Sequence, residues 1–452
     1  MKHRKAVMHF TWLLIIAFGL SSCAAPTPQV VTEVVKEVVT EVVTVKETQV
    51  VVETVVVEPT PAPEQEAETI RIGGVGPLSA PGSYLAGTEM MNAMNMAVDE
   101  INDAGGLLGK PVELIVGDTE GLPERGTAVA ERLISQNKVV ALVGEFHSGP
   151  GMAALEVAHK YHVPFIQVDT WRDEITGSGY PEIFRIAPTN AYYANVHTNY
   201  IKEAGWKTMV HINENTDFGI ELAEATQKDL EAEGISVELM YAELDVEDFT
   251  PLLQRIQLNP PDVIDVGLTG AASYRLQRQA CEMGIAPTAT TAIATNLDVQ
   301  YPDFWEAVGE CGVYTVFPYI GLPGSRRTEK TIAFFNAYKE RYQQNPGAAA
   351  HAAYDAISIL FDAIERAGTT DPDALIAALE ETDFEGVQGK YFFTYTSKNP
   401  VPSDVPAWMW HQWPLPNVYY LQYTAEGQTV DDAVIVFPRE YATGPAYTPP
   451  PK

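Results

Sequence analysis

Ser148 stands at a position where a serine can hold an anionic ligand. The apolar run 139–144 predicts a buried strand, and a helix is expected from Ser148 to about residue 161, after which the next strand begins. A helix N-terminus has unpaired N–H groups and partial positive charge, so it can bind a carboxylate. The other interpretation is that the Ser148 hydroxyl only caps its own helix, and the sequence leaves both open.

The loop 169–176, Asp-Thr-Trp-Arg-Asp-Glu-Ile-Thr, follows the next predicted strand, 163–168. Asp169 favours a cation or a hydroxyl-bearing ligand, although it could also cap the following turn. Trp171 could stack on a ligand or close off a pocket, with Asp169 or Thr170 supplying the polar contact.

These loops follow strands in a regular alternation of strands and helices. Strands are expected at 69–73, 112–116, 139–144 and 163–168, with helices between them. This alternation predicts a doubly wound parallel sheet, in which ligands bind beyond the carboxyl ends of the strands. The rule selects the loops that begin near Ser79, Glu145, Asp169, Asn213 and Thr269.

A chain of 452 residues is too long for one ordinary core, so two α/β lobes are expected. Between residues 209 and 283, three predicted strands alternate with three predicted helices and form the second lobe. The helices expected at 328–343 and 348–367 belong to the first lobe again.

The composition argues against several classes of function. The formal net charge is −31, which disfavours nucleic acid and charge-driven binding to an anionic membrane. The sequence has no G-x-S-x-G elbow, no H-E-x-x-H motif and no phosphate-binding G-x-x-x-x-G-K-[ST] loop. His159 and His162 are three apart on a predicted helix, but they lack an accompanying acidic or cysteine set. We therefore predict no catalytic residues, no metal and no cofactor.

The N-terminus predicts an export signal. Residues 1–22 combine basic residues with the apolar run 10–20, which is too short to span a bilayer. The sequence Leu-Ser-Ser-Cys23 resembles a bacterial lipobox, which implies cleavage before Cys23 and a diacylglycerol on its sulfur. A plain secretory signal is the alternative.

Residues 23–68 form a low-complexity segment. Val pairs alternate with Thr, Lys and Glu pairs, and the segment ends in the Pro- and Glu-rich run EPTPAPEQEAE. Such a composition predicts a tether that holds the folded body away from the membrane. A self-associating stalk is the alternative.

The stretch 69–118 carries a family resemblance. Its pattern I-x-G-x-x-x-P-L-S, followed by A-V-x-x-I-N-x-x-G-G-L-x-G-x-x-x-x-L-x-x-x-D, resembles type I periplasmic-binding proteins. The similarity is closer to the leucine/isoleucine/valine-binding receptors of ABC transporters, and it continues to about residue 443. It implies two doubly wound parallel-sheet lobes joined by a three-crossing hinge.

The resemblance also implies how the chain is divided. The segments expected are lobe 1 at 69–187, lobe 2 at 188–315, lobe 1 again at 316–388, a closing segment of lobe 2 at 389–440 and a tail at 441–452. The crossings are expected within 181–188, 313–319 and 388–396.

In the first lobe, the resemblance implies that Ser148 holds a ligand carboxylate and that Phe146 and His147 flank it. Tyr84 matches a cleft tyrosine. Trp171 falls where amino-acid receptors have a carboxylate-binding threonine, which is the clearest departure from the pattern. A shift of one residue would put Thr170 at that position instead.

In the second lobe, the resemblance implies a cleft turn at Asp217-Phe218-Gly219, with Phe218 replacing the usual tyrosine, and a cleft residue at Thr269. The acidic residue that holds a ligand ammonium should fall near Asn296 or Asp298, and alignment does not choose between them.

Cys281 and Cys311 would lie in an exported protein, where disulfides are permitted. The two cysteines could pair, or they could remain buried free thiols.

Together these features predict a lipid-anchored receptor at the outer face of the membrane or in the periplasm. It would deliver an amino-acid-like or small carboxylate or amide solute to the permease of an ABC importer by closing its cleft. The alternative is a ligand-sensing module that signals to a membrane partner.

Overall fold

The computed structural model of the chain describes residues 68–449. The predicted signal segment, Cys23 and almost the whole tether lie outside the described residues, as do residues 450–452. Within 68–449, no helix combines the length and the apolar character needed to cross a membrane.

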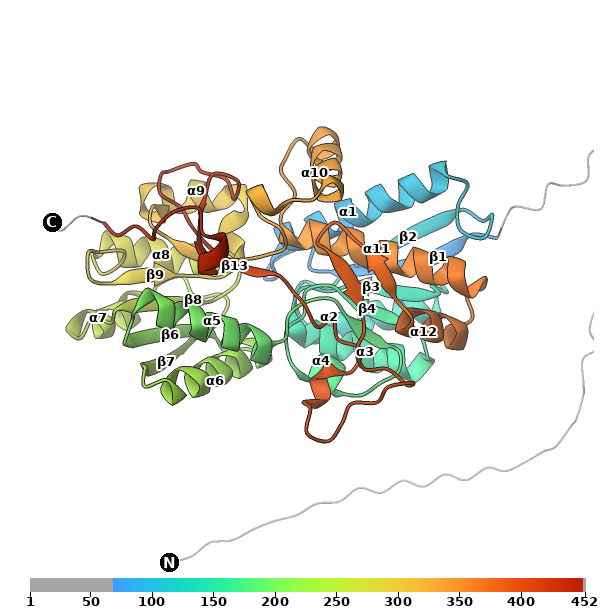
Figure 1. The fold of residues 1–452 in the computed structure, drawn as a ribbon, viewed down its shortest axis with the longest axis horizontal. Helices are drawn as coiled ribbons and strands as arrows, with labels where there is room; N and C mark the ends of the chain where they lie inside the picture. Colours follow the sequence, from blue (N-terminus) through green and yellow to red (C-terminus); the bar gives the residue numbers. More distant parts are fainter. Residues whose placement is uncertain (1–67, 450–452) are drawn as a thin grey trace, which may run out of the picture. The chain divides into compact units, whose positions relative to one another are not determined.

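The first lobe is built on a five-stranded parallel sheet (Figure 1). Its strand order is β2-β1-β3-β4-β5. The strands are β1 (Ile70–Gly76), β2 (Val112–Asp118), β3 (Ala141–Gly144), β4 (Phe165–Gln167) and β5 (Ile183–Arg185). The continuous apolar run of β3 is typical of a parallel strand buried on both faces. The order reverses between β1 and β3, which is where doubly wound sheets bind ligands.

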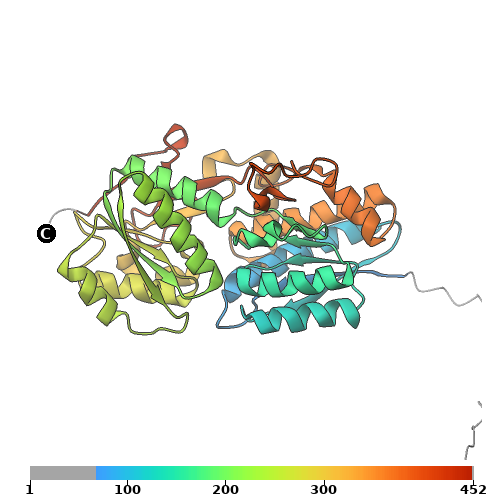
Figure 2. The same cartoon turned by 90° about the horizontal axis from the view of Figure 1, so that it is seen from below.

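Helices cover both faces of this sheet. On one face, α1 (Tyr84–Asp103) and α11 (Ala348–Ala367) pack together, and α12 (Pro372–Glu380) joins the same core. On the other face lie α2 (Pro123–Ser135) and α3 (Ser148–Tyr161), which Figure 2 shows side by side. The apolar stripe predicted from Met90 to Ile101 lies on α1 and faces the core.

The second lobe is built on a seven-stranded sheet of order β14-β13-β10-β9-β8-β6-β7. Its parallel strands are β6 (Thr208–Glu214), β7 (Ser236–Ala242), β8 (Val263–Gly267), β9 (Ala292–Ala294) and β10 (Val316–Ile320). Two antiparallel strands, β13 (Val418–Gln422) and β14 (Val434–Phe437), extend its edge. The predicted fold class, two doubly wound lobes, is confirmed, and the antiparallel edge is an addition to it.

The helices of the second lobe also lie on both faces. One core contains α5 (Asn190–Ala204) and α6 (Asp217–Ala232), and the other contains α7 (Thr250–Leu258) and α8 (Ala271–Glu282). Helix α5 was not predicted, because His197 and several tyrosines occupy its buried face and break the apolar stripe.

The chain passes between the lobes three times, and two of these passages differ from the expected positions. The first runs through 186–189 and overlaps the end of the expected range, 181–188. The second comes after Ile320, because β10 belongs to the second sheet and not to the first lobe. The third comes after Trp413, because residues 390–413 pack on the first lobe through Tyr391, His411 and Trp413.

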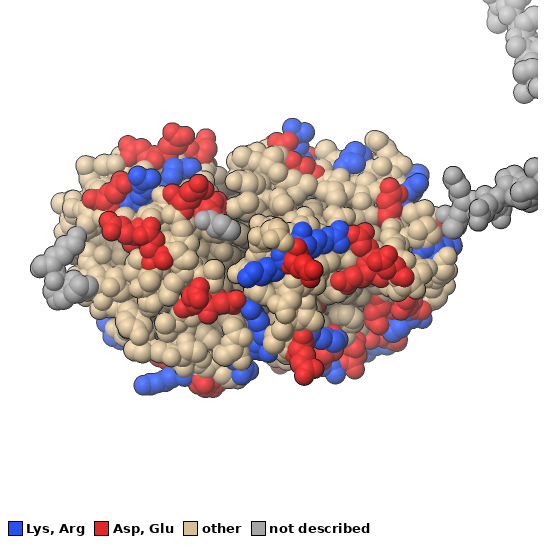
Figure 3. All heavy atoms as spheres, turned by 90° about the horizontal axis from the view of Figure 1, so that it is seen from above, with Lys and Arg blue, Asp and Glu red and all other residues tan. Residues whose placement is uncertain are grey.

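Charged side chains are spread over the described surface. On the face shown in Figure 3, acidic and basic residues are interspersed, with more acidic than basic side chains visible. This distribution accords with a strongly acidic composition.

Cys281, near the end of α8, forms a disulfide with Cys311, and the Cα–Cα distance is 5.7 Å. Cys311 lies in the short 3₁₀ helix Gly309–Gly312, which follows α9 (Pro302–Val308). The bond closes a 30-residue loop that contains β9 and the cleft residues near Asn296. It therefore ties the end of α8 to the segment that follows α9.

Replacing both cysteines, Cys281→Ala with Cys311→Ala, should lower the free energy of unfolding by about 3 kcal/mol, because the open chain regains loop entropy. Urea unfolding of the oxidised protein and the double variant measures this difference. Treatment with a reductant should destabilise the parent protein and leave the variant unchanged; equal stability of both proteins before reduction would contradict the prediction.

Candidate functional site

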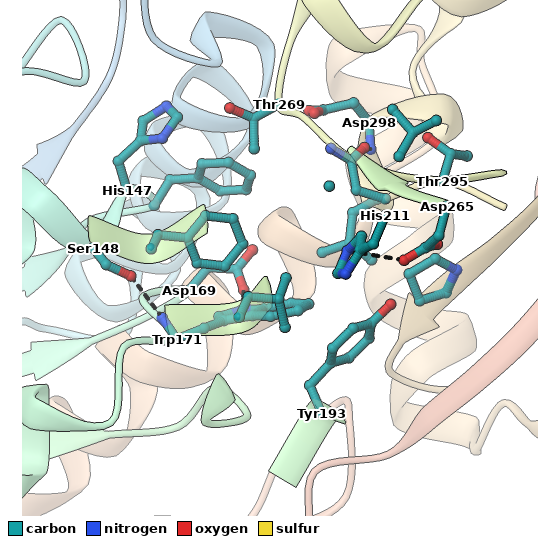
Figure 4. A pocket seen from close by; sticks show the side chains of 18 residues that line it. His147, Ser148, Asp169, Trp171, Tyr193, His211, Asp265, Thr269, Thr295 and Asp298 are labelled. Carbon is teal, nitrogen blue, oxygen red and sulfur yellow. Dashed lines mark hydrogen bonds and ion pairs between the residues drawn. The ribbon is translucent and has the colours of Figure 1, made fainter. Parts of the chain in front are cut away.

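A cavity lies between the two lobes at the carboxyl ends of their central strands (Figure 4). Its empty space is about 650 Å³, part of which is open solvent. The first lobe contributes the residues that follow β3 and β4. The second lobe contributes residues from β6, β8, β10 and the loops and helices beside them. Both lobes thus present the edges at which doubly wound sheets bind ligands.

Eight of the ten predicted ligand-binding residues line this cavity: Phe146, His147, Ser148, Asp169, Trp171, Phe218, Thr269 and Asn296. The other two do not. Tyr84 is the first residue of α1 and its side chain is 46% exposed. Thr170 is buried and donates a hydrogen bond to Gln167 Oε1 at 3.0 Å, so it points away from the cavity. The one-residue shift that would place Thr170 in the site is not what the structure shows.

A tight turn brings Ser148 into the cleft. Gly144, at the end of β3, has φ of +135°, and a Cβ there would lie 2.0 Å from the carbonyl oxygen of Val75. Only glycine allows this approach of β3 to β1. Glu145 then adopts a left-handed conformation, and α3 begins at Ser148.

The Ser148 hydroxyl does not cap its own helix; the N-cap residue is His147. Instead, Ser148 Oγ accepts hydrogen bonds from the backbone N–H groups of Trp171 at 3.0 Å and Arg172 at 3.2 Å. These bonds tie the start of α3 to the loop after β4. The hydroxyl proton remains available as a donor at the N-terminus of a helix, where an anion is favoured.

His147, which precedes Ser148, is an uncharged hydrogen-bond donor beside the N-terminus of α3. Burial lowers the pKa of His147 to about 4, so the ring is uncharged near neutral pH. Its Nε2 accepts a hydrogen bond from the backbone N–H of Ser83 at 2.9 Å. The ring proton therefore sits on Nδ1.

Trp171 forms an aromatic wall of the cavity. Its ring contacts Tyr193 at a centroid distance of 4.9 Å and Phe218 at 6.0 Å. Its Nε1–H donates to Asp169 Oδ1 at 2.7 Å. The buried guanidinium of Arg185 holds the loop in place by donating to the carbonyl oxygen of Arg172 at 2.5 Å. Trp171 thus places a large ring in the cavity wall, at the position where the family pattern has a threonine.

Two carboxyl groups that line the cavity come from different lobes. Burial, together with the charge of Asp298 in the second lobe, raises the pKa of Asp169 in the first lobe to about 7. Burial likewise raises the pKa of Asp298 to about 7, although its Oδ2 accepts the backbone N–H of Gly270 at 2.6 Å. Among the described residues that line the cavity there is no lysine or arginine. An ammonium group would offset both carboxylates.

Asn296 faces the cavity as a donor. Its Oδ1 accepts a hydrogen bond from the backbone N–H of Asp298 at 3.0 Å, and its buried Nδ2 has no partner. A free amide N–H suits an acceptor oxygen and not an ammonium. Of the two candidates for the ammonium-binding residue, the geometry favours Asp298.

Several lining residues were not predicted. Tyr193, His211 and Asp265 are polar, and the others are Leu222, Val266, Gly267, Thr295, Leu297 and Pro318. One sequence signal could have found two of them: His211 and Asp265 interrupt otherwise apolar parallel strands, where a buried polar residue is costly.

Elsewhere in residues 68–449, no group of three or more His, Cys, Asp or Glu side chains is placed to hold a metal ion. His159 and His162 both contact the carboxylate of Glu182, at 2.8 and 2.5 Å, so the fold gives them an acidic partner that was not found in the sequence.

Two doubly wound lobes, three connections between them and a cavity enclosed by both define a two-lobed solute-binding protein. The comparison with family models agrees: the chain belongs to the periplasmic binding protein family, whose model matches residues 69–409. Members of this family are extracytoplasmic solute receptors and not enzymes. The predicted resemblance to leucine/isoleucine/valine-binding receptors is therefore confirmed at the level of the family.

Individual relatives support the assignment. The leucine-, isoleucine-, valine-, threonine- and alanine-binding protein of Pseudomonas aeruginosa is 25% identical over 351 residues, which cover 76% of this chain and 91% of that protein. Among solved structures, the fold is similar to the substrate-binding protein LivJ of Streptococcus pneumoniae in complex with isoleucine, with a TM-score of 0.69, 24% identity and coverage of 84% and 100%. A solute-binding protein of Rhodopseudomonas palustris in complex with 3,4-dihydroxybenzoic acid has a TM-score of 0.68, 22% identity and coverage of 81% and 95%.

Asp169→Asn should make the ligand-free protein less sensitive to pH. A carboxyl whose pKa is raised on folding binds its proton more tightly in the folded state, so it lowers stability as pH rises from about 4 to about 7. Asparagine keeps the acceptor for Trp171 Nε1 and removes the titration. Between about pH 4 and pH 7, the free energy of unfolding of the variant should therefore rise by on the order of 3 kcal/mol relative to that of the parent protein.

Urea unfolding at pH 4.5, 6 and 8 measures the effect. The matched control is Asp404→Asn, at an exposed position, which should leave the pH dependence unchanged. Other buried carboxyls titrate in the same range, so the slope should decrease without vanishing. Identical slopes for the parent protein and Asp169→Asn would show that burial of Asp169 has no such effect.

Proposed function

We propose that this protein is a lipid-anchored receptor that binds an amino-acid-like solute between its lobes and delivers it to an ABC importer. One observation carries the proposal: the cavity offers an anion site on one lobe and carboxylates from both lobes beside it. Ser148 at the start of α3 suits a ligand carboxylate, and Asp169 with Asp298 suits an ammonium. These are the two charged ends of an amino acid.

The relative from Pseudomonas aeruginosa supports this ligand class, since its name specifies leucine, isoleucine, valine, threonine and alanine. The substitution of Trp171 for the usual threonine changes how the carboxylate is held. In this chain the Ser148 hydroxyl, the first N–H groups of α3 and the Asn296 amide are the available donors. They replace the contact that the threonine would make.

The contacts across the cleft support a closing mechanism. Arg172 of the first lobe pairs with Asp217 at 2.8 Å and with Glu221 at 3.3 Å, both on α6 of the second lobe. Glu221 also accepts the backbone N–H of Asp173 at 2.7 Å. A ligand that bridges Ser148 and Asp298 would add to these contacts only when the lobes are together. It would therefore favour the closed form, which docks on the permease.

The anchor would be the lipid on Cys23, followed by the tether 24–68. A thioether diacylglycerol together with an amide-linked acyl chain holds a protein stably on a membrane, whereas one acyl chain binds only marginally. The tether would let the folded body of the receptor contact the permease while the lipid stays in the membrane.

Ser148→Ala should weaken amino-acid binding. The change removes a hydroxyl donor to the ligand carboxylate and loosens the loop that carries Trp171, so the affinity should fall by about tenfold or more. The tightest ligand is first found by thermal shift with leucine, isoleucine, valine, threonine, alanine, asparagine and glutamine, and its dissociation constant is then measured by calorimetry.

Ser236→Ala, at an exposed position on β7, is the matched control and should bind like the parent protein. Melting temperatures of both variants establish that they are folded. Unchanged affinity in folded Ser148→Ala would contradict the proposed carboxylate site.

Cys23→Ser should release the protein from the membrane. In a bacterial host, the parent chain should partition with the membrane fraction and have a mature mass that begins at lipid-modified Cys23. The variant lacks the sulfur that accepts the lipid, so it should appear in the soluble exported fraction or remain unprocessed. Soluble parent protein with an unmodified N-terminus would indicate a plain secretory signal instead.

A further inference from the structure

A polar cluster lies in the middle of the second lobe, where apolar residues are expected. His211 is central in β6 and Asp265 is central in β8, and both are buried. The residues that alternate with them, Val210, Ile212 and Ile264, lie in the apolar core on the opposite face of the sheet. Because burying charged groups is costly, a cluster at this place calls for a specific role.

The cluster is connected by short contacts. Asp265 Oδ2 lies 3.0 Å from His211 Nε2 and 3.3 Å from His197 Nε2. His197 Nδ1 lies 2.5 Å from the hydroxyl of Tyr420, which in turn donates to the hydroxyl of Tyr193 at 2.9 Å. Burial alone would raise the pKa of Asp265, but the two histidines hold that pKa well below its usual range, so the group stays a carboxylate.

Three members of this cluster line the ligand cavity: Tyr193, His211 and Asp265 (Figure 4). Each has hydrogen-bonding capacity left over. The Tyr193 oxygen accepts from Tyr420, so its own proton is free to donate. The Nε2 atoms of both histidines contact Oδ2 of Asp265, so Oδ1 remains available as an acceptor.

His211 adds a second polar atom. Its Nε2 faces the carboxylate of Asp265, so Nδ1 is left for another partner. This Nδ1 is buried and has no partner. A buried ring nitrogen without a hydrogen-bond partner is rare in folded proteins, and its position in the cavity wall points to a partner supplied by a ligand.

We infer that Tyr193, His211 and Asp265 form a second subsite that binds a carboxamide at the end of the solute's side chain. The amide NH₂ would donate to Asp265 Oδ1, the amide oxygen would accept from the Tyr193 hydroxyl, and His211 Nδ1 would lie against the same amide. An aliphatic side chain would leave all three groups without partners. This inference rests on the proposed amino-acid receptor and makes an amide-bearing amino acid its solute.

The experiment compares amides with apolar side chains of similar size. Asparagine is tested against leucine, which has nearly the same shape, and glutamine against methionine. The dissociation constants are measured by calorimetry for the parent protein, Tyr193→Phe and Tyr200→Phe. In the parent protein, the amide that fits should bind about tenfold or more tightly than its apolar counterpart, because the apolar ligand leaves buried polar groups unpaired.

Tyr193→Phe should weaken amide binding by roughly tenfold and leave binding of the apolar ligand nearly unchanged. Tyr200→Phe is the matched control. Tyr200 lies on the same helix, is buried and stacks on Tyr420 at 4.2 Å, but its hydroxyl has no partner and it does not line the cavity. It should leave all four affinities unchanged.

Two results would overturn the inference while leaving the receptor proposal in place. The first is that leucine or methionine binds the parent protein as tightly as the amides do. This result does not depend on the folding of any variant. The other is a folded Tyr193→Phe that leaves the preference for the amide intact. In both cases Ser148→Ala would still weaken binding. Failure of asparagine and glutamine to bind would overturn the inference alone, whereas failure of every amino acid in the thermal-shift series would overturn the proposed function as well.

Discussion

Asp169 and Asp298 face a single cavity from opposite lobes, and no lysine or arginine among the described residues lines that cavity. Each carboxyl is buried, so each is costly to ionise, and ionising both adds repulsion between the lobes. In the proposed receptor, the ammonium of a solute would favour the ionised forms of both carboxyls. Because the two groups come from different lobes, this would link the chemistry of the ligand to the motion of the lobes.

The fold creates this situation through the direction of its strands. Both sheets reverse their strand order at the cleft, β1/β3 in the first lobe and β6/β8 in the second. The loops after β3 and β4 therefore meet residues that follow β6, β8 and β9 around one space. Arg185 and Ser148 then fix the loop after β4, which places Trp171 against Tyr193 and Phe218. Hydrogen bonds from side chains to the backbone of this loop therefore position the aromatic wall. The acidic groups line the remaining part of the cavity.

Much of this arrangement could be predicted from the sequence, because apolar runs and helical stripes set the order of the elements. The strands around Val143 and Ile166, and the helix between them, lie close to their expected positions, and eight of the ten candidate residues line the cavity. Thr170 and Tyr84 were predicted to line the cavity and do not. Alignment indicates which loop a residue occupies but not the direction of its side chain. Tyr193 and His197 were missed because polar residues on the buried face of α5 hide its helical stripe.

The most direct test is a crystal structure of the protein with the tightest-binding amino acid from the thermal-shift series. The account predicts the ligand carboxylate at Ser148 and the first turn of α3, and its ammonium between Asp169 and Asp298. A ligand bound in the opposite orientation, or one that contacts only one lobe, would contradict it. The same electron density would show which residues its side chain meets in the second lobe.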